Sequence, residues 1–224
     1  MTGRVALIGF GEAGRTFAMA GGWGQRASAH DLLGQEAGMR SAMAAADVMA
    51  CASTAEAVDG ARLVLSLVTA DQALIAAREA ARTIAPGTLF CDMNSVAPQT
   101  KQAAAKAIDA ACGHYVDVAV MAPVNPVPLL LAGSKATEAL AALAALGFAN
   151  MRMAGDAVGR ASAIKMIRSV MVKGMEALTA ECVLAAEQAG VLDEVIASLD
   201  ASEKPKPWAE RADYNLDRMM VHGL

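Results

Sequence analysis

A glycine-rich turn close to the N-terminus constrains the fold of this chain most. Residues 5–8 are apolar and partly β-branched, which suits a buried strand. Gly9, Gly11 and Gly14 follow with G-x-G-x-x-G spacing, and apolar residues then recur at helical spacing from Glu12 onward. A strand, a glycine turn and a helix in this order are typical of a dinucleotide-binding site, where free N–H groups of the helix face the phosphates. We predict such a site, against the alternative of a glycine-rich surface turn.

An acidic residue follows the turn at the spacing that such a site requires. Residues 27–31 predict a short second strand that ends in Asp31, about 20 residues after the turn. A carboxylate at this place binds the hydroxyls of the adenosine ribose and repels a 2′-phosphate. Asp31 therefore favours NAD over NADP as the cofactor, although Arg26 and Arg40 could supply counter-charges for the phosphate of NADP.

Short apolar runs alternate with alanine-rich helical segments through the first two thirds of the chain. This alternation predicts an α/β fold with a Rossmann-type, doubly wound parallel sheet. Ligands of such sheets bind beyond the carboxyl ends of the strands. The glycine turn, residues 69–71, residues 94–95 and the segment after Val120 all follow predicted strands, so we expect them to converge. Asp117 lies inside a predicted strand, which is unusual for a core position, and we expect it to hydrogen-bond a neighbouring loop.

The pattern changes beyond Gly155. Residues 157–189 have helical periodicity without proline, and Gly190 stands where a helix would end. Some 30 helical residues would span on the order of 45–50 Å, as helices that link domains or lie in an oligomer interface do. Further helical segments follow. We predict a dinucleotide-binding domain over residues 1–155 and a helical substrate and dimerisation domain over residues 156–224.

The composition excludes several classes of protein. Of the 224 residues, 55% are hydrophobic and 19% charged, which argues against disorder. The net charge is −4 and no long basic run occurs, so we expect no nucleic-acid partner. We expect no membrane span and a cytoplasmic protein, because apolar stretches stay below roughly 18 residues and the N-terminus lacks a signal-peptide pattern. The cysteines lack metal-type spacing, which predicts reduced, mostly buried thiols and no metal site.

Four motifs together resemble the β-hydroxyacid dehydrogenases, the family that contains the 3-hydroxyisobutyrate and 6-phosphogluconate dehydrogenases. Residues 9–14 resemble the cofactor turn of the family, and residues 92–98 resemble its D-x-N-S-x-x-P loop. Residues 115–120 resemble the strand that leads to its substrate loop, and residues 159–165 resemble its G-x-x-x-x-x-K pattern. The run over residues 165–174 is closest to an uncharacterised bacterial branch described as 6-phosphogluconate dehydrogenase-like.

The resemblance implies roles for individual residues. Lys165 would be the catalytic lysine, Ser95 would contact the substrate carboxylate, and Asn94 would lie near the nicotinamide. Each also has an ordinary structural interpretation: a surface lysine, a helix-capping serine and a turn-forming asparagine. The resemblance further implies a homodimer, because relatives complete the active site with helices of a partner chain. The predicted cofactor-binding residues are Gly9, Phe10, Gly11, Glu12, Ala13, Gly14, Asp31, Val68, Thr69 and Asn94.

The sequence departs from the family pattern in three places. Ser169 replaces the usual asparagine four residues after Lys165, and it shares a helix face with that lysine, so it could still donate a hydrogen bond to substrate. Residues 121–125 replace a glycine-rich substrate loop. Met121 and Ala122 are therefore predicted to contact a substrate other than the standard small 3-hydroxy acids. The helical domain is also shorter than in relatives, and we expect it to be incomplete.

These features lead to one expected function and two alternatives. Oxidation of an alcohol needs a hydride acceptor and a base. A lysine with its ordinary pKa of about 10.4 is a poor base, but burial beside a positive nicotinamide would lower that pKa. We expect an NAD(P)-dependent dehydrogenase that acts on a 3-hydroxy acid or sugar acid, with Lys165 as general acid and base. An imine or keto reductase on the same scaffold and a nucleotide-binding dimer without activity stay open as alternatives.

Overall fold

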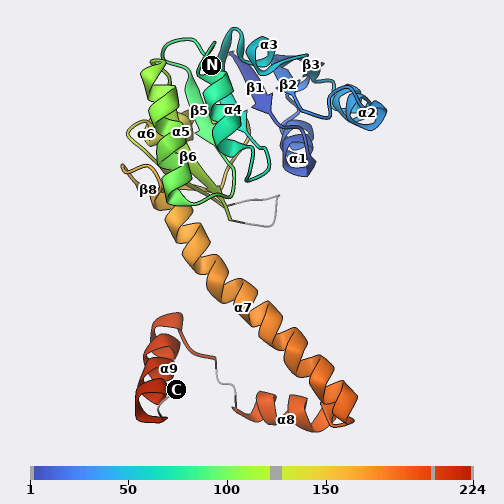
Figure 1. Ribbon diagram of the computed structural model, residues 1–224, viewed down its shortest axis with the longest axis vertical. Helices are drawn as coiled ribbons and strands as arrows, with labels where there is room; N and C mark the ends of the chain where they lie inside the picture. Colours follow the sequence, from blue (N-terminus) through green and yellow to red (C-terminus); the bar gives the residue numbers. More distant parts are fainter. Residues whose placement is uncertain (1–2, 122–127, 203–204, 223–224) are drawn as a thin grey trace. The chain divides into compact units, whose positions relative to one another are not determined.

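The computed structural model describes residues 3–121, 128–202 and 205–222 (Figure 1). The chain divides into two compact units, Met1–Val170 and Met171–Leu224. The first unit holds the sheet and the helices that cover it, and the second unit is helical. The domain boundary placed after residue 155 stays a prediction.

A single sheet of the first unit confirms the predicted fold class. Its strands lie in the order β3-β2-β1-β4-β5-β6-β7-β8, so the chain winds outward from β1 in both directions. β1, β2, β4, β5 and β6 pair in parallel, which places their carboxyl ends at one edge of the sheet. The strands are β1 (Arg4–Ile8), β2 (Ala27–His30), β3 (Met49–Ala50), β4 (Ala61–Ser66), β5 (Leu89–Asp92), β6 (His114–Val120), β7 (Leu129–Ala132) and β8 (Met151–Gly155).

One strand of this mostly parallel sheet runs in the opposite direction, which the sequence did not predict. β7 pairs antiparallel to β6, with Val120 opposite Leu129, whereas β8 returns to a parallel pairing with β7. The physical reason is the length of the connection. Only residues 121–128 separate the two strands, and a parallel crossover needs about a dozen residues or more. The chain therefore reverses direction after β6.

Helices cover both faces of the sheet, as the burial of successive residues of β1 requires. Val5 and Leu7 belong to a core cluster with residues of α1, α2 and α6, whereas Ala6 and Ile8 belong to a second cluster with residues of α3, α4 and α5. Strands buried on both faces are typical of parallel sheets. The helices are α1 (Glu12–Ala20), α2 (Ala37–Ala45), α3 (Thr54–Val58), α4 (Ala73–Ala80), α5 (Pro98–Ala110) and α6 (Ala136–Ala145).

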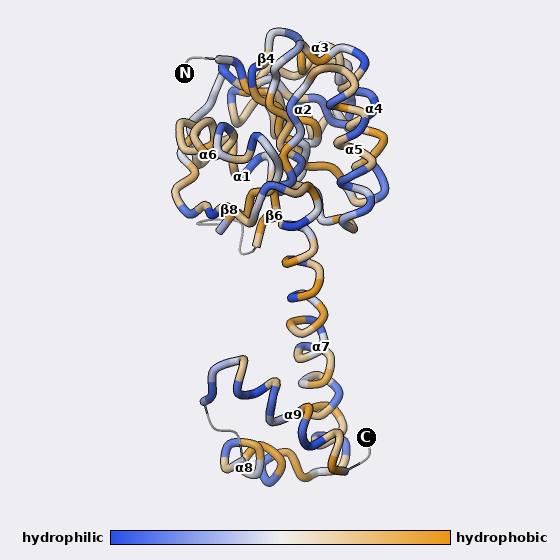
Figure 2. Tube along the Cα trace, turned by 90° about the vertical axis from the view of Figure 1, so that its left-hand side faces the viewer, coloured by the Kyte–Doolittle hydropathy of each residue, from blue (hydrophilic) through white to orange (hydrophobic). Residues whose placement is uncertain are grey.

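In the described part of the chain after β8, three helices follow. α7 (Arg160–Ala189) begins in the first unit and ends in the second, which also contains α8 (Leu192–Ser202) and α9 (Trp208–His222). Hydrophobic and hydrophilic residues alternate along these helices (Figure 2). Several of their large apolar side chains are more than half exposed: Leu178, Leu184, Trp208, Leu216, Met220 and Val221.

Three further expectations concern membranes, metals and thiols. No helix among the described residues is long and apolar enough to cross a membrane. Within the described ranges, no group of three or more His, Cys, Asp and Glu side chains is arranged to hold a metal ion. All four cysteines are free thiols; Cys51 and Cys91 are buried, but Cys112 is exposed and Cys182 is half-buried. Burial of the thiols is thus less complete than predicted.

Candidate functional site

Each of the three glycines of the turn, Gly9, Gly11 and Gly14, stands in different surroundings, so a side chain would have a different effect at each. Gly9 has a φ of +93°, and a Cβ there would lie 2.5 Å from the carbonyl oxygen of Leu67. A Cβ on Gly14 would lie 2.9 Å from the carbonyl oxygen of Gly9, so this glycine lets α1 pack close to the turn. A Cβ on Gly11 would meet no atom within 4 Å. The open space at Gly11, the residue before α1, is where the backbone can approach a ligand phosphate.

A cavity of about 340 Å³ lies beside this turn, at the carboxyl ends of β1, β2 and β4. Five of the predicted cofactor residues line it: Gly9, Gly11, Asp31, Val68 and Thr69. The sequence interpretation missed the other polar and apolar lining residues, which follow the same strand ends or lie on α2, α3 and α4. These additional residues include His30, Leu32, Leu33, Met39, Thr54, Gln72, Ile75 and Glu79.

Asp31 couples the cavity to the glycine turn. One carboxylate oxygen of Asp31 accepts a hydrogen bond from the backbone N–H of Phe10 at 2.7 Å, and the other accepts from the N–H of Leu33 at 2.9 Å. Each carboxylate oxygen has a second acceptor direction. The side chain is therefore fixed in orientation and can still accept hydrogen bonds from ribose hydroxyls in the cavity.

The remaining predicted cofactor residues lie outside the lining of this cavity. Phe10 is fully buried in the core, and Ala13 packs against the same cluster. Glu12 is exposed at the start of α1. Asn94 is buried, with its amide oxygen accepting from the N–H of Val68 at 2.7 Å and its amide nitrogen donating to Ser66 Oγ at 2.9 Å. The observed contacts of Asn94 therefore join the ends of β4 and β5.

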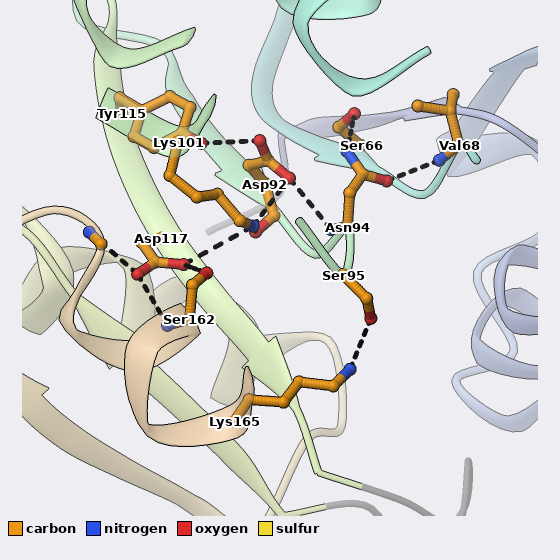
Figure 3. A network of polar contacts seen from close by, with 11 residues as sticks. Ser66, Val68, Asp92, Asn94, Ser95, Lys101, Tyr115, Asp117, Ser162 and Lys165 are labelled. Atoms are coloured by element: carbon orange, nitrogen blue, oxygen red, sulfur yellow. Dashed lines mark hydrogen bonds and ion pairs between the residues drawn. The ribbon is translucent and has the colours of Figure 1, made fainter. Parts of the chain in front are cut away.

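Lys165 and Ser95 meet although 70 residues separate them in sequence (Figure 3). Ser95 lies in the loop after β5, and Lys165 lies in the second turn of α7. The Lys165 ammonium donates to Ser95 Oγ at 2.6 Å. Burial, first, and the positive charge of Lys101, second, lower the pKa of Lys165 below its ordinary value of 10.5. Both causes favour the neutral amine, which is the form that can accept a proton.

Three residues besides Ser95 were predicted to contact the substrate: Met121, Ala122 and Ser169. Ser169 donates its hydroxyl to the backbone carbonyl of Lys165 at 2.8 Å, so its single proton is engaged within α7. Met121 is half-buried and packs against a small apolar cluster that includes Ala119 and Ala161. Ala122 lies outside the described residues.

A buried polar network that the sequence interpretation missed lies behind Ser95 and Lys165. Lys101 is fully buried and lies 2.9 Å from Asp92 and 3.5 Å from Asp117. The Tyr115 hydroxyl donates to Asp92 at 2.6 Å. Asp117 accepts from the N–H of Gly159 at 3.0 Å, which confirms the expected bond between this strand residue and a neighbouring loop. The sequence signal for the network was the charged residue within an otherwise apolar strand.

Comparison with known proteins identifies the family of this chain. Residues 4–125 match the family described as the NAD binding domain of 6-phosphogluconate dehydrogenase. The match covers more than half of the chain, and the chain belongs to this family. Residues 186–224 match a domain of unknown function, DUF1932. The family expected from the four motifs is thereby confirmed.

Relatives of known structure extend over both units. A conserved hypothetical protein from Sinorhizobium meliloti is 39% identical, with a TM-score of 0.73 over 100% of this chain and 77% of that chain. A conserved protein of unknown function, reported to resemble 3-hydroxyacid dehydrogenases, is 30% identical, with a TM-score of 0.70 over 98% of this chain and 83% of that chain.

A further relative is known from its sequence comparison. An uncharacterized 28.5 kDa protein from Methanothermus fervidus is 29% identical over 64% of this chain. The match covers only 55% of the Methanothermus protein.

An enzyme of lower identity shares the fold. The imine reductase from Myxococcus stipitatus with NADP+ is 19% identical, with a TM-score of 0.76 over 98% of this chain and 78% of that chain. Its V8 variant with NAD+ is 20% identical, with a TM-score of 0.75 over 100% of this chain and 78% of that chain. At this identity the likeness concerns the fold alone.

Proposed function

We propose that the protein is an NAD(P)-dependent oxidoreductase that transfers a hydride between nicotinamide and a 3-hydroxy acid or sugar acid. The observation that carries this proposal is the 2.6 Å contact between Lys165 Nζ and Ser95 Oγ. Ser95 follows β5 at the same edge of the sheet as the glycine turn, which follows β1. Family membership supplies the expectation of a dinucleotide at that turn.

In this proposal Lys165 transfers the proton and Ser95 orients the substrate. A bound nicotinamide would accept or supply the hydride. The neutral amine of Lys165 takes the proton of the substrate hydroxyl during oxidation and returns it during reduction. Ser95 Oγ, held against Lys165, orients the substrate by a hydrogen bond to its carboxylate. The lowered pKa of Lys165 increases the fraction of neutral amine at a given pH.

NAD is the cofactor that the charges of the cavity favour. Asp31 and Glu79 line the cavity, and none of the residues described as lining it is Lys or Arg. Two carboxylates repel the 2′-phosphate of NADP, whereas Asp31 can accept hydrogen bonds from the hydroxyls of NAD. Separate fluorescence titrations with NADH and NADPH test the preference. Tighter binding of NADPH would refute it without affecting the assignment of Lys165.

A substrate panel tests the activity itself. We expect NAD+ reduction with at least one 3-hydroxy acid or sugar acid, and a loss of at least about 100-fold in turnover in Lys165→Met, as for removal of a general base. Lys106→Met is the matched control, because Lys106 is an exposed lysine on α5. Binding of NADH should survive in both variants. Turnover in Lys165→Met equal to that of the wild type would refute the assigned chemistry.

Imine or keto reduction is the second candidate. Two observations favour it: residues 121–125 lack the glycine-rich pattern of hydroxy-acid enzymes, and the fold is shared with an imine reductase. Assays that follow NADH or NADPH consumption with cyclic imines and with ketone–amine pairs discriminate the two functions. Turnover confined to hydroxy acids would exclude this candidate. Binding of the dinucleotide without any turnover would instead favour the nucleotide-binding dimer.

A further inference from the structure

Lys101 of α5 is buried and pairs with two carboxylates, Asp92 of β5 and Asp117 of β6. These three residues form an ion cluster (Figure 3). The Lys101 ammonium lies 2.9 Å from Asp92 Oδ1 and 3.5 Å from Asp117 Oδ1, and it donates to the backbone carbonyl of Asp92 at 2.6 Å. Asp92 and Asp117 are opposite one another in the pairing of β5 with β6. Two buried carboxylates in this register would repel one another, and Lys101 supplies the compensating charge between them.

The first arm of the cluster leads to the loop that carries Ser95. Asp92 Oδ1 accepts the backbone N–H of Asn94 at 2.9 Å. The side chain of Asn94 in turn hydrogen-bonds Ser66, the last residue of β4, and the backbone N–H of Val68, two residues further on. The Tyr115 hydroxyl fixes the other oxygen of Asp92. The backbone immediately before Ser95 is thus tied to the cluster.

The second arm leads to the helix that carries Lys165. Asp117 Oδ2 accepts from the backbone N–H groups of Gly159 and Ser162, both at 3.0 Å, and Asp117 Oδ1 accepts from Ser162 Oγ at 2.7 Å. A carboxylate at a helix N-terminus satisfies free N–H groups and complements the helix dipole. Lys165 follows Ser162 by three residues, so the two share a face of α7.

We propose that Lys101 is a positioning residue, which holds the Lys165 amine against Ser95 by tying the segments of both residues to one buried ion cluster. Its value for hydride transfer rests on the function proposed above. The cluster and the Lys165–Ser95 contact close a ring of interactions through the ends of β5 and β6 and the first turns of α7. Loosening either arm would therefore move the amine away from Ser95 and into water.

Electrostatics add to this geometric role. Lys101 is the second cause, after burial, of the lowered pKa of Lys165. Asp92 from β5 and Asp117 from β6 are the acidic members of the cluster, and both are paired with Lys101. Ser95 faces the Lys165 amine as a neutral acceptor. A change in the cluster should consequently appear in the titration of Lys165 itself.

The test is the pKa of the Lys165 amine, measured by NMR on full-length protein labelled at the side-chain carbons of lysine. The signal is assigned by its loss in Lys165→Arg. We expect Ser162→Ala, which removes one bond of the second arm, to raise this pKa by about half a unit or more, because the amine gains solvent. Lys101→Met should raise it further wherever that variant folds. Ser53→Ala is the matched control, since Ser53 caps α3 by accepting the N–H of Glu56 and touches neither arm.

The outcomes separate this proposal from the proposed function. A raised pKa in Ser162→Ala with an unchanged pKa in Ser53→Ala supports the positioning role. An unchanged pKa in a folded Ser162→Ala overturns it, whether or not Lys101→Met folds. An equal rise in Ser53→Ala also overturns it, because general loosening would then be the cause. The measurement uses no substrate, so an inactive wild-type protein would refute the enzyme and leave the positioning result intact.

Discussion

Gly11 offers the clearest separation of cofactor binding from stability. Its φ of −68° and ψ of −158° are accessible to alanine, and an added Cβ would meet no atom within 4 Å. We predict that Gly11→Ala leaves the free energy of unfolding unchanged or raises it by up to about 1 kcal/mol, because the unfolded chain loses freedom. The new methyl group would occupy the space through which the N-terminus of α1 reaches a pyrophosphate.

The expected effect on binding follows from the hydrogen bonds that the methyl group displaces. Loss of one charge-assisted bond, about 1.5–3 kcal/mol, corresponds to a weakening of roughly 10- to 150-fold in the dissociation constant for NADH. Calorimetric titration measures this constant, and urea unfolding measures stability. The contrasting variant is Gly14→Ala, whose Cβ would lie 2.9 Å from a carbonyl oxygen. That overpacking should cost about 1–3 kcal/mol of stability. Wild-type affinity for NADH in Gly11→Ala would refute the assigned position of the phosphates.

Three further predictions concern charge and burial. Tyr115→Phe removes the 2.6 Å bond to Asp92 and should lower the free energy of unfolding by about 1.5–3 kcal/mol in urea titrations; an unchanged midpoint would contradict a structural role for this bond. Glu79→Gln should tighten NADPH binding several-fold with little effect on NADH, and equal changes for both would exclude charge repulsion as the cause. The pKa of Lys165 is lower in the folded protein than its ordinary 10.5. Its protonated form therefore destabilises the fold below the folded pKa, and this penalty fades as pH rises towards the unfolded value. Lys165→Met should accordingly raise the melting temperature more at neutral pH than near pH 10.5, and a pH-independent difference would count against the lowered pKa.

Much of the first unit could be predicted because its strands are local apolar runs between clear turn signals. The short apolar run over residues 89–92, for example, coincides with β5 (Leu89–Asp92). The apolar run over residues 63–68 is shifted by two residues from the strand it marks, because β4 spans Ala61–Ser66. The reversal at β7 was missed because the periodicity of a strand carries no information on its direction. The length of the connection before Leu129 was the signal that could have revealed it.

The parts of the site that consist of a local sequence motif could be predicted. The parts that form only when distant residues meet in the fold could not. The glycine turn and Asp31 follow from spacing alone, and the structure places both beside one cavity. Lys101 lies in an alanine-rich segment whose local pattern does not distinguish it from a surface lysine. Its burial depends on two acids, Asp92 and Asp117, which meet only through the register of β5 and β6. The roles of the site residues, the homodimer, the hydroxy-acid substrate and the cytoplasmic location stay predictions.

The most direct test of the account is the pKa of Lys165 measured in the free protein, with NAD+ and with NADH. Each cofactor is added at a saturating concentration. The oxidised nicotinamide ring is positive and the reduced ring is neutral, so a ring beside Lys165 should depress the pKa further with NAD+ than with NADH. A lower pKa in the NAD+ complex is the result that the account predicts. Identical pKa values in the two complexes would place the ring away from Lys165 and contradict the proposed hydride transfer at this amine.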